Sequence, residues 1–392
     1  MRIFVFFVFI TPSNVQFYWG DAPAYVSLAE NIASGKGFLN ANGRVDTLWF
    51  PAYPYFLAFL LIISGGNCLI AAIFQIILSC FIPLLIYFIG NKLFNAEVSF
   101  IASAIAIFYP LLVFFSGIFS WAAFIALSLL LLVFISIDIA RRLYLRTVLL
   151  AVLSSIIFLA HSEFLFLAPL ILIWFAMNLR KQPRRLAAAA AVYLISWTLI
   201  SSPWYIRNYN VYGRFILEPS LHGGSALYQG NNEFSDGTVP NQKAYGHIRE
   251  IDKKIRYMSD IEKNRHYYKL SLNFISKYPR TFFILCIKRF FAFWAIFPRH
   301  ESLFKNTFVR IINLCTYGTL IPFIIIGFIS GLKEWKRLFL LYSIVILKVG
   351  VHVIVASGMG YRAVIDPFVI IFGALGIQQL SGKLKTKKNI CC

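Results

Sequence analysis

The residues able to do chemistry in this chain lie in short polar stretches between long apolar runs. The first stretch contains Asp21, Arg44 and Asp46, and the carboxylates of the two aspartates could accept a hydrogen bond or a proton from a hydroxyl group. Two later arginines, Arg207 and Arg362, carry guanidinium groups whose geometry matches phosphate oxygens. Each residue type also has a purely structural explanation. Aspartate is a preferred helix cap, and arginine at the end of a membrane span can reach lipid headgroups.

A short helix is expected directly after Asp21, which could cap it, with Pro23 tolerated in the first turn. Gly35 and Gly37 should end this helix, and the segment 50–55 should open a second short one. Together these patterns predict a loop that lies on the membrane surface and holds Asp21 there. The apolar face of the first helix is formed at helical spacing by Tyr25, Leu28, Ala29 and Ile32.

The composition indicates a membrane protein. Hydrophobic residues make up 59% of the 392 residues and charged residues only 14%, whereas soluble domains have about 25% charged residues. Long apolar runs recur along the chain, so we predict an all-α, polytopic helical protein. The net charge of +21 lies mostly between these runs, which favours anionic lipid over nucleic acid as the partner.

About ten transmembrane helices are predicted, with the N-terminus inside. Lysine and arginine are concentrated in the short loops that this arrangement places inside, as the positive-inside rule requires. The segment 281–298 is apolar but carries Lys288 and Arg289 near its middle, so we expect it to lie in the outer interface rather than span. The predicted spans are 2–18, 68–90, 98–115, 119–140, 147–160, 164–178, 186–202, 308–329, 338–356 and 363–380.

This topology divides the chain into three parts. Residues 1–202 form an N-terminal transmembrane module whose first outer loop is 19–67. Residues 203–306 form a large extracytoplasmic loop with an interfacial helix. Residues 307–392 form the last transmembrane helices and a basic tail on the cytoplasmic side.

Four polar clusters fall on the outer side in this topology, and they predict a site built on the ends of spans. Lys348 and His352 are different, because they lie four residues apart inside a span. We expect Lys348 to be satisfied by backbone carbonyl groups, although a transporter would use this pair as its central site. The outer clusters are Asp21 with Arg44 and Asp46, His161 with Glu163, the segment 204–208, and Tyr361–Arg362 with Asp366.

Three of these stretches resemble a known family. The first reads DAPAYVSLAENIASGKGF followed by PAYPYFL, the second PWYIRNYNVYGRF, and the third GYRAVIDPFVII. In this order they resemble the GT-C superfamily of membrane glycosyltransferases, in the branch of protein O-mannosyltransferases and lipid A aminoarabinose transferases. The similarity covers most of the chain in patches, and its motifs are short and degenerate.

The resemblance implies a glycosyltransferase of the bacterial inner membrane with its active site on the extracytoplasmic side. It would transfer a hexose or pentose from a polyprenyl phosphate to a hydroxyl group on a protein, lipid or glycan, with inversion. Asp21 would be catalytic, and Arg207 and Arg362 would bind the donor phosphate. Supporting roles would fall to Tyr25, Arg44, Asp46, His161, Glu163 and Tyr361.

The chain also departs from the family pattern. Family members usually have an acidic residue at the start of the fourth span, where this chain has Ser120, Trp121 and Ala122. No set of residues has the spacing of metal ligands, so the need for a divalent cation stays open. Two alternatives therefore remain: a transporter or flippase for lipid-linked sugars, and a non-catalytic partner subunit.

Overall fold

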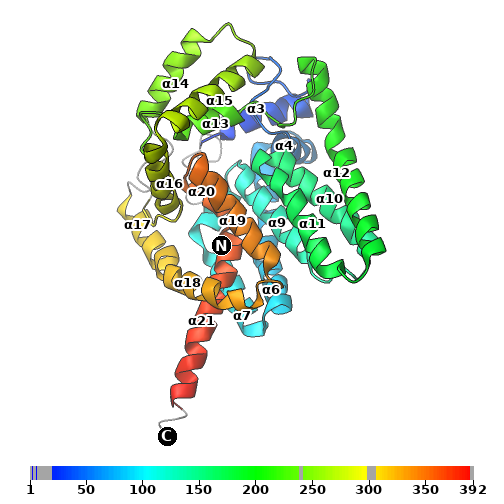
Figure 1. Ribbon diagram of the computed structural model, residues 1–392, viewed down its shortest axis with the longest axis vertical. Helices are drawn as coiled ribbons and strands as arrows, with labels where there is room; N and C mark the ends of the chain where they lie inside the picture. Colours follow the sequence, from blue (N-terminus) through cyan, green and yellow to red (C-terminus); the bar gives the residue numbers. More distant parts are fainter. Residues whose placement is uncertain (1, 3–5, 7–19, 238–241, 298–305, 389–392) are drawn as a thin grey trace.

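The computed structural model describes residues 2, 6, 20–237, 242–297 and 306–388, and within them the regular structure is helical (Figure 1). One isolated bridge between Leu39 and Val45 is the exception in these ranges. The first predicted span, 2–18, lies outside the described residues apart from Arg2 and Phe6. Arg2 is buried, and its guanidinium donates hydrogen bonds to the Ser79 hydroxyl at 3.0 Å and to the Leu112 carbonyl at 3.2 Å.

The helices of the first half follow the predicted order closely. The two short helices of the first outer loop are present as α3 and α4, and Tyr25, Leu28 and Ala29 of the predicted apolar face are buried. The elements are α3 (Ala22–Ala33), α4 (Ala52–Ile63), α5 (Cys68–Ser79), α6 (Phe81–Leu93), α7 (Ala96–Phe108), α8 (Pro110–Ser116), α9 (Trp121–Ser136), α10 (Leu143–Ala160), η3 (Ser162–Phe166) and α11 (Leu167–Leu179).

The second half begins with the longest helix. It continues through the large loop and ends in a helix that projects from the bundle (Figure 1). The elements are α12 (Pro183–Tyr212), α13 (Gly223–Gly230), α14 (Gln242–Lys254), α15 (Asp260–Lys277), α16 (Pro279–Phe293), α17 (Thr307–Asn313), η5 (Leu314–Gly318), α18 (Thr319–Gly331), η6 (Leu332–Glu334), α19 (Phe339–Ile354), α20 (Met359–Ala363) and α21 (Asp366–Lys388).

Five continuous helical segments of the described chain are long and apolar enough to cross a membrane. A sixth candidate is the pair α7 and α8, which is bent by 55° where Pro110 interrupts the helix. Residues 98–115 were predicted as one span, without a bend being foreseen. Three further apolar helices, α4, α9 and α19, are shorter. The total of ten spans therefore stays a prediction.

The prediction that a membrane helix ends at Ser202 is wrong. Helix α12 runs for 30 residues, passes through Pro203 and ends at Tyr212, where Gly213 adopts a left-handed conformation with φ of 67°. A proline inside a helix removes one hydrogen bond but need not end the helix when neighbouring elements support it. As a result Arg207 lies on the last turns of a long helix rather than in a loop.

The C-terminal helices pack through glycines. Gly327 of α18 lies against the backbone of Phe372, and Gly376 of α21 lies against the backbone of Phe323, with no room for a Cβ atom at either position. Small residues allow this close approach between membrane helices. The pairing anchors α21, which begins just beyond Arg362.

The large loop folds over the first outer loop at one end of the bundle, the upper end in Figure 1. The amide of Leu221 donates to the carbonyl of Thr47 at 2.7 Å, and the Thr47 hydroxyl donates to Asp260 at 2.8 Å. Two helices, α14 and α15, lie within this loop. Segments far apart in sequence therefore meet above the helix ends.

The segment 281–298 was expected to lie in the interface because two charges near its middle disfavour spanning. In the structure α16 is not among the helices that are apolar enough to cross a membrane. Its Arg289 is fully buried and donates to the carbonyls of Gly230, Val353 and Ile354. The charge therefore joins α16 to the ends of α13 and α19.

Candidate functional site

Asp21 stands directly before α3, but its side chain forms no capping hydrogen bond with the helix. The residue is exposed, yet the protein atoms crowded around it desolvate the carboxyl group and raise its pKa from 3.8 to about 6. A carboxyl group with this pKa is still mostly ionised at neutral pH and is a stronger base than an ordinary aspartate. The structural explanation of Asp21 as a helix cap thus loses its main support.

Aromatic rings pack against one another beside Asp21, and we call this group of rings the floor of the site. The ring of Tyr25 meets the rings of Trp49 and Tyr53 edge-on, each with 5.0 Å between centroids. Burial, and after it the negative charge of Asp21, raises the pKa of Tyr25 well above its usual value. His222 of the large loop stacks on Trp49 with 6.4 Å between ring centroids. The two outer loops therefore meet at this floor.

Asp46 shapes the first outer loop. Its carboxylate accepts hydrogen bonds from the amides of Leu48 at 3.0 Å and Trp49 at 2.9 Å. The side chain of Arg44 is exposed at the tip of the same loop, where its carbonyl accepts a bond from the Asn40 amide at 2.8 Å. The Asp46 carboxylate therefore holds the backbone of this loop, and Arg44 faces solvent.

Arg207 joins this loop to the end of α12. Its guanidinium donates to the carbonyl oxygen of Asp46 at 2.8 Å and to the side chain of Asn208 at 3.0 Å. It also lies over the rings of Trp204 and Phe38, at 4.6 and 5.5 Å from their centroids. No carboxylate of the described chain forms an ion pair with this half-buried guanidinium, so its charge can act on a bound anion.

A cavity of about 730 Å³ lies between α4, α5, α9, α10 and α12, with Arg207 among its lining residues. We call it the apolar cavity, because most of its other lining residues are aliphatic or aromatic. On α9 it extends from Ala123 to Leu131, a rise of roughly 12 Å along the helix. An apolar cavity with one cation among its lining residues fits an amphiphile that has an anionic headgroup and a hydrocarbon tail.

Arg362 is placed very differently. It is 1% exposed, pairs with Asp366 at 3.2 Å and lies over the ring of Tyr317 at 3.6 Å. Its guanidinium also donates to the carbonyl of Ala295 at 3.4 Å. Of the two arginines, the geometry favours Arg207 as the group that meets a phosphate. Neither of them forms an ion pair with Asp21 in the structure.

The remaining predicted residues meet in a second place, which we call the buried ion cluster. It consists of Glu163 from η3, Lys348 and His352 from α19, and His161 from the end of α10. The Lys348 ammonium donates to the Glu163 carboxylate, and His352 Nε2 lies 3.1 Å from the same carboxylate. His161 Nδ1 lies 3.4 Å from Glu163, and all these groups except the partly buried His161 are buried.

Aromatic rings enclose the buried ion cluster. The ring of Tyr361 stacks on His352 with 4.0 Å between centroids, and the Lys348 ammonium lies 5.1 Å from the ring of Trp121 and 5.5 Å from that of Tyr361. Trp121 is one of the three residues, Ser120, Trp121 and Ala122, at the place where the resembled family usually has an acidic residue. His161 contacts Phe50 of the first outer loop, with 5.0 Å between ring centroids.

The expectation that backbone carbonyls satisfy Lys348 is wrong, because Glu163 does so. Lys348 and His352 were recognised as a pair from their spacing, but they were not grouped with the outer clusters. A lysine inside a span requires a counter-charge, but the sequence does not indicate which acid provides it. Within the ranges that the structure describes, no cluster of three or more His, Cys, Asp or Glu side chains could hold a metal ion.

The fold is similar to that of a solved archaeal oligosaccharyltransferase. No family model matches the chain, and no curated protein matches it by sequence. The oligosaccharyltransferase of Archaeoglobus fulgidus, tethered to an acceptor peptide, superposes with a TM-score of 0.55 and 15% identity. The same protein, AglB, in complex with an inhibitory peptide and a dolichol-phosphate gives a TM-score of 0.53 and 13% identity.

These superpositions cover 99% of this chain but only 50 and 51% of the oligosaccharyltransferase, so the chain spans about half its length. ArnT from Cupriavidus metallidurans bound to undecaprenyl phosphate gives a TM-score of 0.46 at 13% identity, over 96% of this chain and 76% of the other. The oligosaccharyltransferase belongs to the GT-C superfamily of glycosyltransferases. The chain thus has a GT-C-like fold, as its sequence motifs predicted.

Proposed function

We propose that the protein is a membrane glycosyltransferase that moves a sugar from a polyprenyl phosphate to a hydroxyl acceptor outside the cytoplasm. One observation carries the proposal: a cavity of about 730 Å³, largely apolar, is lined at the end of α12 by Arg207. Arg207 in turn contacts the loop that presents Asp21. Such an arrangement suits a donor with a hydrocarbon tail, a phosphate and a sugar.

Each residue of this site would have its own role in the transfer reaction. Arg207 would bind the donor phosphate and stabilise the negative charge that develops as the sugar leaves. Asp21 would accept the proton of the acceptor hydroxyl, whose oxygen attacks the anomeric carbon. The bond between that carbon and the phosphate oxygen breaks, and polyprenyl phosphate departs. A single displacement of this kind inverts the configuration of the sugar.

The other predicted residues would support the site. Tyr25 would form its floor, and Asp46 would hold the loop that Arg207 contacts. His161, Glu163 and Tyr361 would fix the neighbouring helix ends, and Arg44 would face the acceptor from the loop tip. For Arg362 to bind the donor phosphate, it would have to leave its ion pair with Asp366.

The proposed setting is a bacterial inner membrane, with about ten spans and the loops around Asp21 on the extracytoplasmic side. The fold similarity supports a lipid-linked donor, because the structure of the archaeal neighbour contains a dolichol-phosphate. That neighbour also holds a peptide, while here the acceptor is proposed only as a protein, lipid or glycan with a free hydroxyl group. Metal ions are not part of the proposed steps.

The test is a transfer assay on the purified full-length protein in lipid nanodiscs. Polyprenyl phosphates that carry different hexoses or pentoses are offered with a cell-envelope extract as the acceptor mixture. We expect one donor to be consumed and polyprenyl phosphate to be released, and Asp21→Asn to stop the release. If no donor is consumed, or if Asp21→Asn consumes donor at the normal rate, the proposal is wrong.

The buried ion cluster favours a second candidate, a transporter of lipid-linked sugars. Ionisable groups inside a membrane bundle often mark transport pathways, and Lys348 is fully buried there. A transporter would move its substrate across vesicles without cleaving it, and Lys348→Met would stop that movement while Asp21→Asn would not. A transferase would instead lose its activity in Asp21→Asn. Assays of one donor with the two variants therefore distinguish the two candidate functions.

A further inference from the structure

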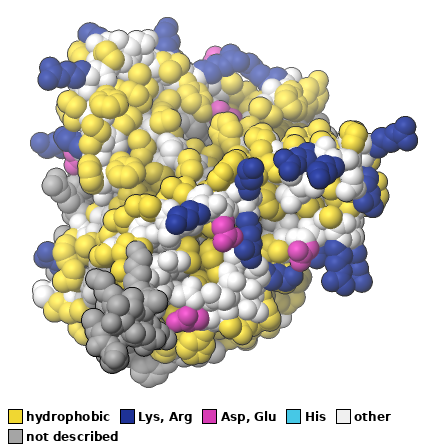
Figure 2. Space-filling model, turned by 60° about the horizontal axis from the view of Figure 1, so that its bottom comes forward, with side chains coloured by type: hydrophobic (Ala, Val, Ile, Leu, Met, Phe, Trp, Pro, Cys, Tyr) yellow, Lys and Arg dark blue, Asp and Glu magenta, His cyan; other side chains and the backbone are white. Residues whose placement is uncertain are grey.

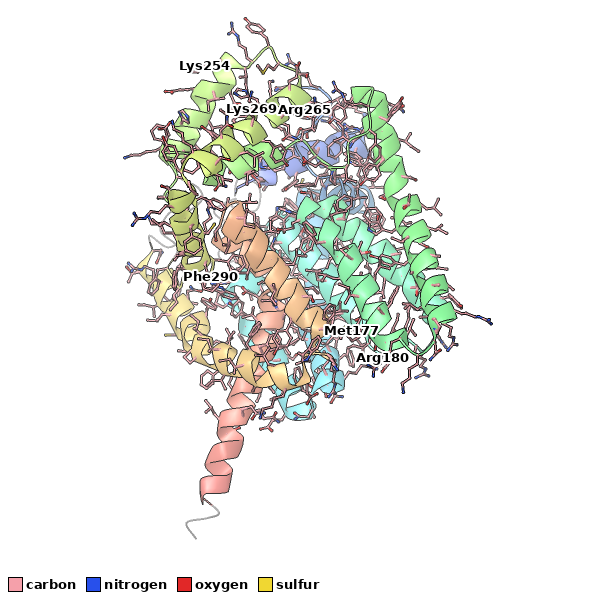
Figure 3. All side chains as sticks on the ribbon, in the orientation of Figure 1. Met177, Arg180, Lys254, Arg265, Lys269 and Phe290 are labelled. Carbon is pink, nitrogen blue, oxygen red and sulfur yellow. The ribbon has the colours of Figure 1, made fainter. Side chains whose placement is uncertain are left out.

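A second cavity lies at the end of the bundle opposite the large loop. It has a volume of about 640 Å³ and lies between the ends of α6, α9 and α11 and the start of α19. We call it the basal cavity. Arg180, one of its lining residues, sits at the turn between α11 and α12, far from Lys254 of the large loop (Figure 3).

Cations dominate the mouth of the basal cavity. Lys92, Arg180, Lys336 and Arg337 line it, and Asp138 is its one acidic lining residue. Figure 2, which turns the lower end of the molecule toward the viewer, shows lysine and arginine side chains on this face and few acidic ones. The excess of positive charge would attract an anion.

Two of these cations have no acidic partner in the described part of the chain. Lys92 pairs with Asp138 at 2.9 Å, and Arg337 pairs with Glu334 at 2.8 Å. Arg180 and Lys336 form no ion pair there, although both line the cavity. They are therefore the groups whose charge is available to a ligand.

The cavity is held in shape by contacts between its helices. The Arg337 guanidinium donates to the carbonyl of Lys92 at 2.9 Å, which ties the start of α19 to the end of α6. The indole of Trp174 donates to the carbonyl of Ser136 at 3.3 Å, which ties α11 to the end of α9. These bonds join four helices that are distant in sequence.

Part of the lining of the basal cavity is apolar. Val133, Leu340 and Leu341 are buried residues that line it, and the rings of Trp174 and Trp335 also take part. A soluble anion such as free phosphate would use the cations but leave this apolar lining unused. A phospholipid uses both, since its phosphate can meet the cations while part of an acyl chain enters between the helices.

We propose that the basal cavity binds one anionic phospholipid and that this lipid joins the ends of α6, α9, α11 and α19. The site is independent of the proposed transfer reaction, because it lies at the other end of the bundle. Positive residues near a membrane surface also serve to orient a protein, but orientation does not require a cavity. The cavity with its two unpaired cations is what distinguishes a binding site from a general surface charge.

The experiment measures quenching of tryptophan fluorescence by lipids with brominated chains. The delipidated full-length protein in neutral detergent is titrated with brominated phosphatidylglycerol, with brominated phosphatidylcholine, or with inorganic phosphate as a competitor. A Trp335→Phe variant identifies the part of the signal that comes from the cavity. We expect saturable quenching by phosphatidylglycerol at low concentration, reduced in this variant because only Trp174 then reports from the cavity, and unaffected by millimolar phosphate.

Two double variants with the same loss of charge provide the comparison. Arg180→Gln with Lys336→Gln removes the unpaired cations of the cavity and should weaken phosphatidylglycerol binding on the order of tenfold or more. Lys181→Gln with Arg184→Gln removes two exposed cations on the same end that do not line the cavity, and it should bind normally. Thermal unfolding of both variants without lipid shows whether each is folded.

The proposal is overturned by any of three results. Equal weakening in both double variants would indicate attraction by general surface charge. Equal quenching by phosphatidylcholine would indicate an apolar groove without headgroup recognition. Full competition by inorganic phosphate would indicate a site for a soluble anion.

Discussion

Two polar regions lie near the same end of the bundle, and they differ in access. Around Asp21 and Arg207 the charged groups are exposed or half-buried, and Arg207 lines a cavity of about 730 Å³. In the buried ion cluster Glu163, Lys348 and His352 are buried and pair with one another. A charge that binds a substrate must be accessible to it, whereas a buried ion pair joins the helices that carry its two charges. The first region is thus suited to chemistry and the second to structure.

The two arginines repeat this contrast within one residue type. Arg207 donates to the carbonyl of Asp46 and the side-chain oxygen of Asn208 and keeps a charge that no carboxylate neutralises, while Arg362 is paired with Asp366. Both were predicted as phosphate ligands from the sequence because each stands near the outer end of a span. The structure distinguishes the two by their partners. Arg207 contacts a carbonyl and an amide oxygen, whereas Arg362 contacts a carboxylate. Substitutions should therefore change activity at one and stability at the other.

The largest effect is expected from Asp21→Asn. It removes the carboxylate that would accept the acceptor proton, and general base catalysis is worth roughly 10² to 10⁴ in rate. Release of polyprenyl phosphate from the active donor measures the loss. Unfolding should be unchanged, since the Asp21 side chain caps nothing. Glu30→Gln, an exposed acid on the same helix, is the matched control and should retain full activity.

Substitution of Glu163 should act on stability instead. Glu163→Gln leaves the buried ammonium of Lys348 without a counter-charge, which typically costs about 3 to 5 kcal/mol. The midpoint of thermal unfolding in nanodiscs measures the loss. Adding Lys348→Met to Glu163→Gln should recover much of it, because no unpaired charge then remains. A double variant whose loss equals the sum of the single losses would show that the two residues are independent.

The paired variants Arg207→Gln and Arg362→Gln test the contrast between the arginines directly. For Arg207→Gln we expect kcat/KM to fall roughly 10- to 100-fold, because a hydrogen bond to a charged group is worth about 1.5 to 3 kcal/mol. Its unfolding midpoint should change little. For Arg362→Gln the midpoint should drop, since Asp366 would be buried without its partner. The reverse pattern would place the donor phosphate at Arg362.

The sequence predicted the elements of this protein better than their partners. The two helices of the first outer loop follow from local spacing and glycine positions, so they could be read from residues 20–63. The pairing of Lys348 with Glu163 depends on helices that are 185 residues apart in sequence, and no local pattern reports it. The continuation of α12 through Pro203 depends likewise on tertiary support, so the position of Arg207 on a helix could not be predicted.

The smallest predicted effect is a change of the transfer rate with pH, which identifies the group that acts as the base. With a pKa near 6, the carboxyl group of Asp21 is half protonated at pH 6 and about 90% protonated at pH 5. Transfer needs the ionised form, so the rate should rise with pH, reach half its maximum near pH 6 and level off above pH 7. An ordinary aspartate would give half the maximum near pH 4.

A histidine could produce a similar curve, and His222 lies close to the same floor. Burial lowers the pKa of His222 below its usual 6.5, so its titration could overlap with that of Asp21. His222→Gln removes this group and keeps a polar side chain in its place. If the midpoint of the rate profile stays near pH 6 in this variant, the titrating group is the carboxylate. A flat profile would instead assign the dependence to His222 and leave Asp21 with an ordinary pKa.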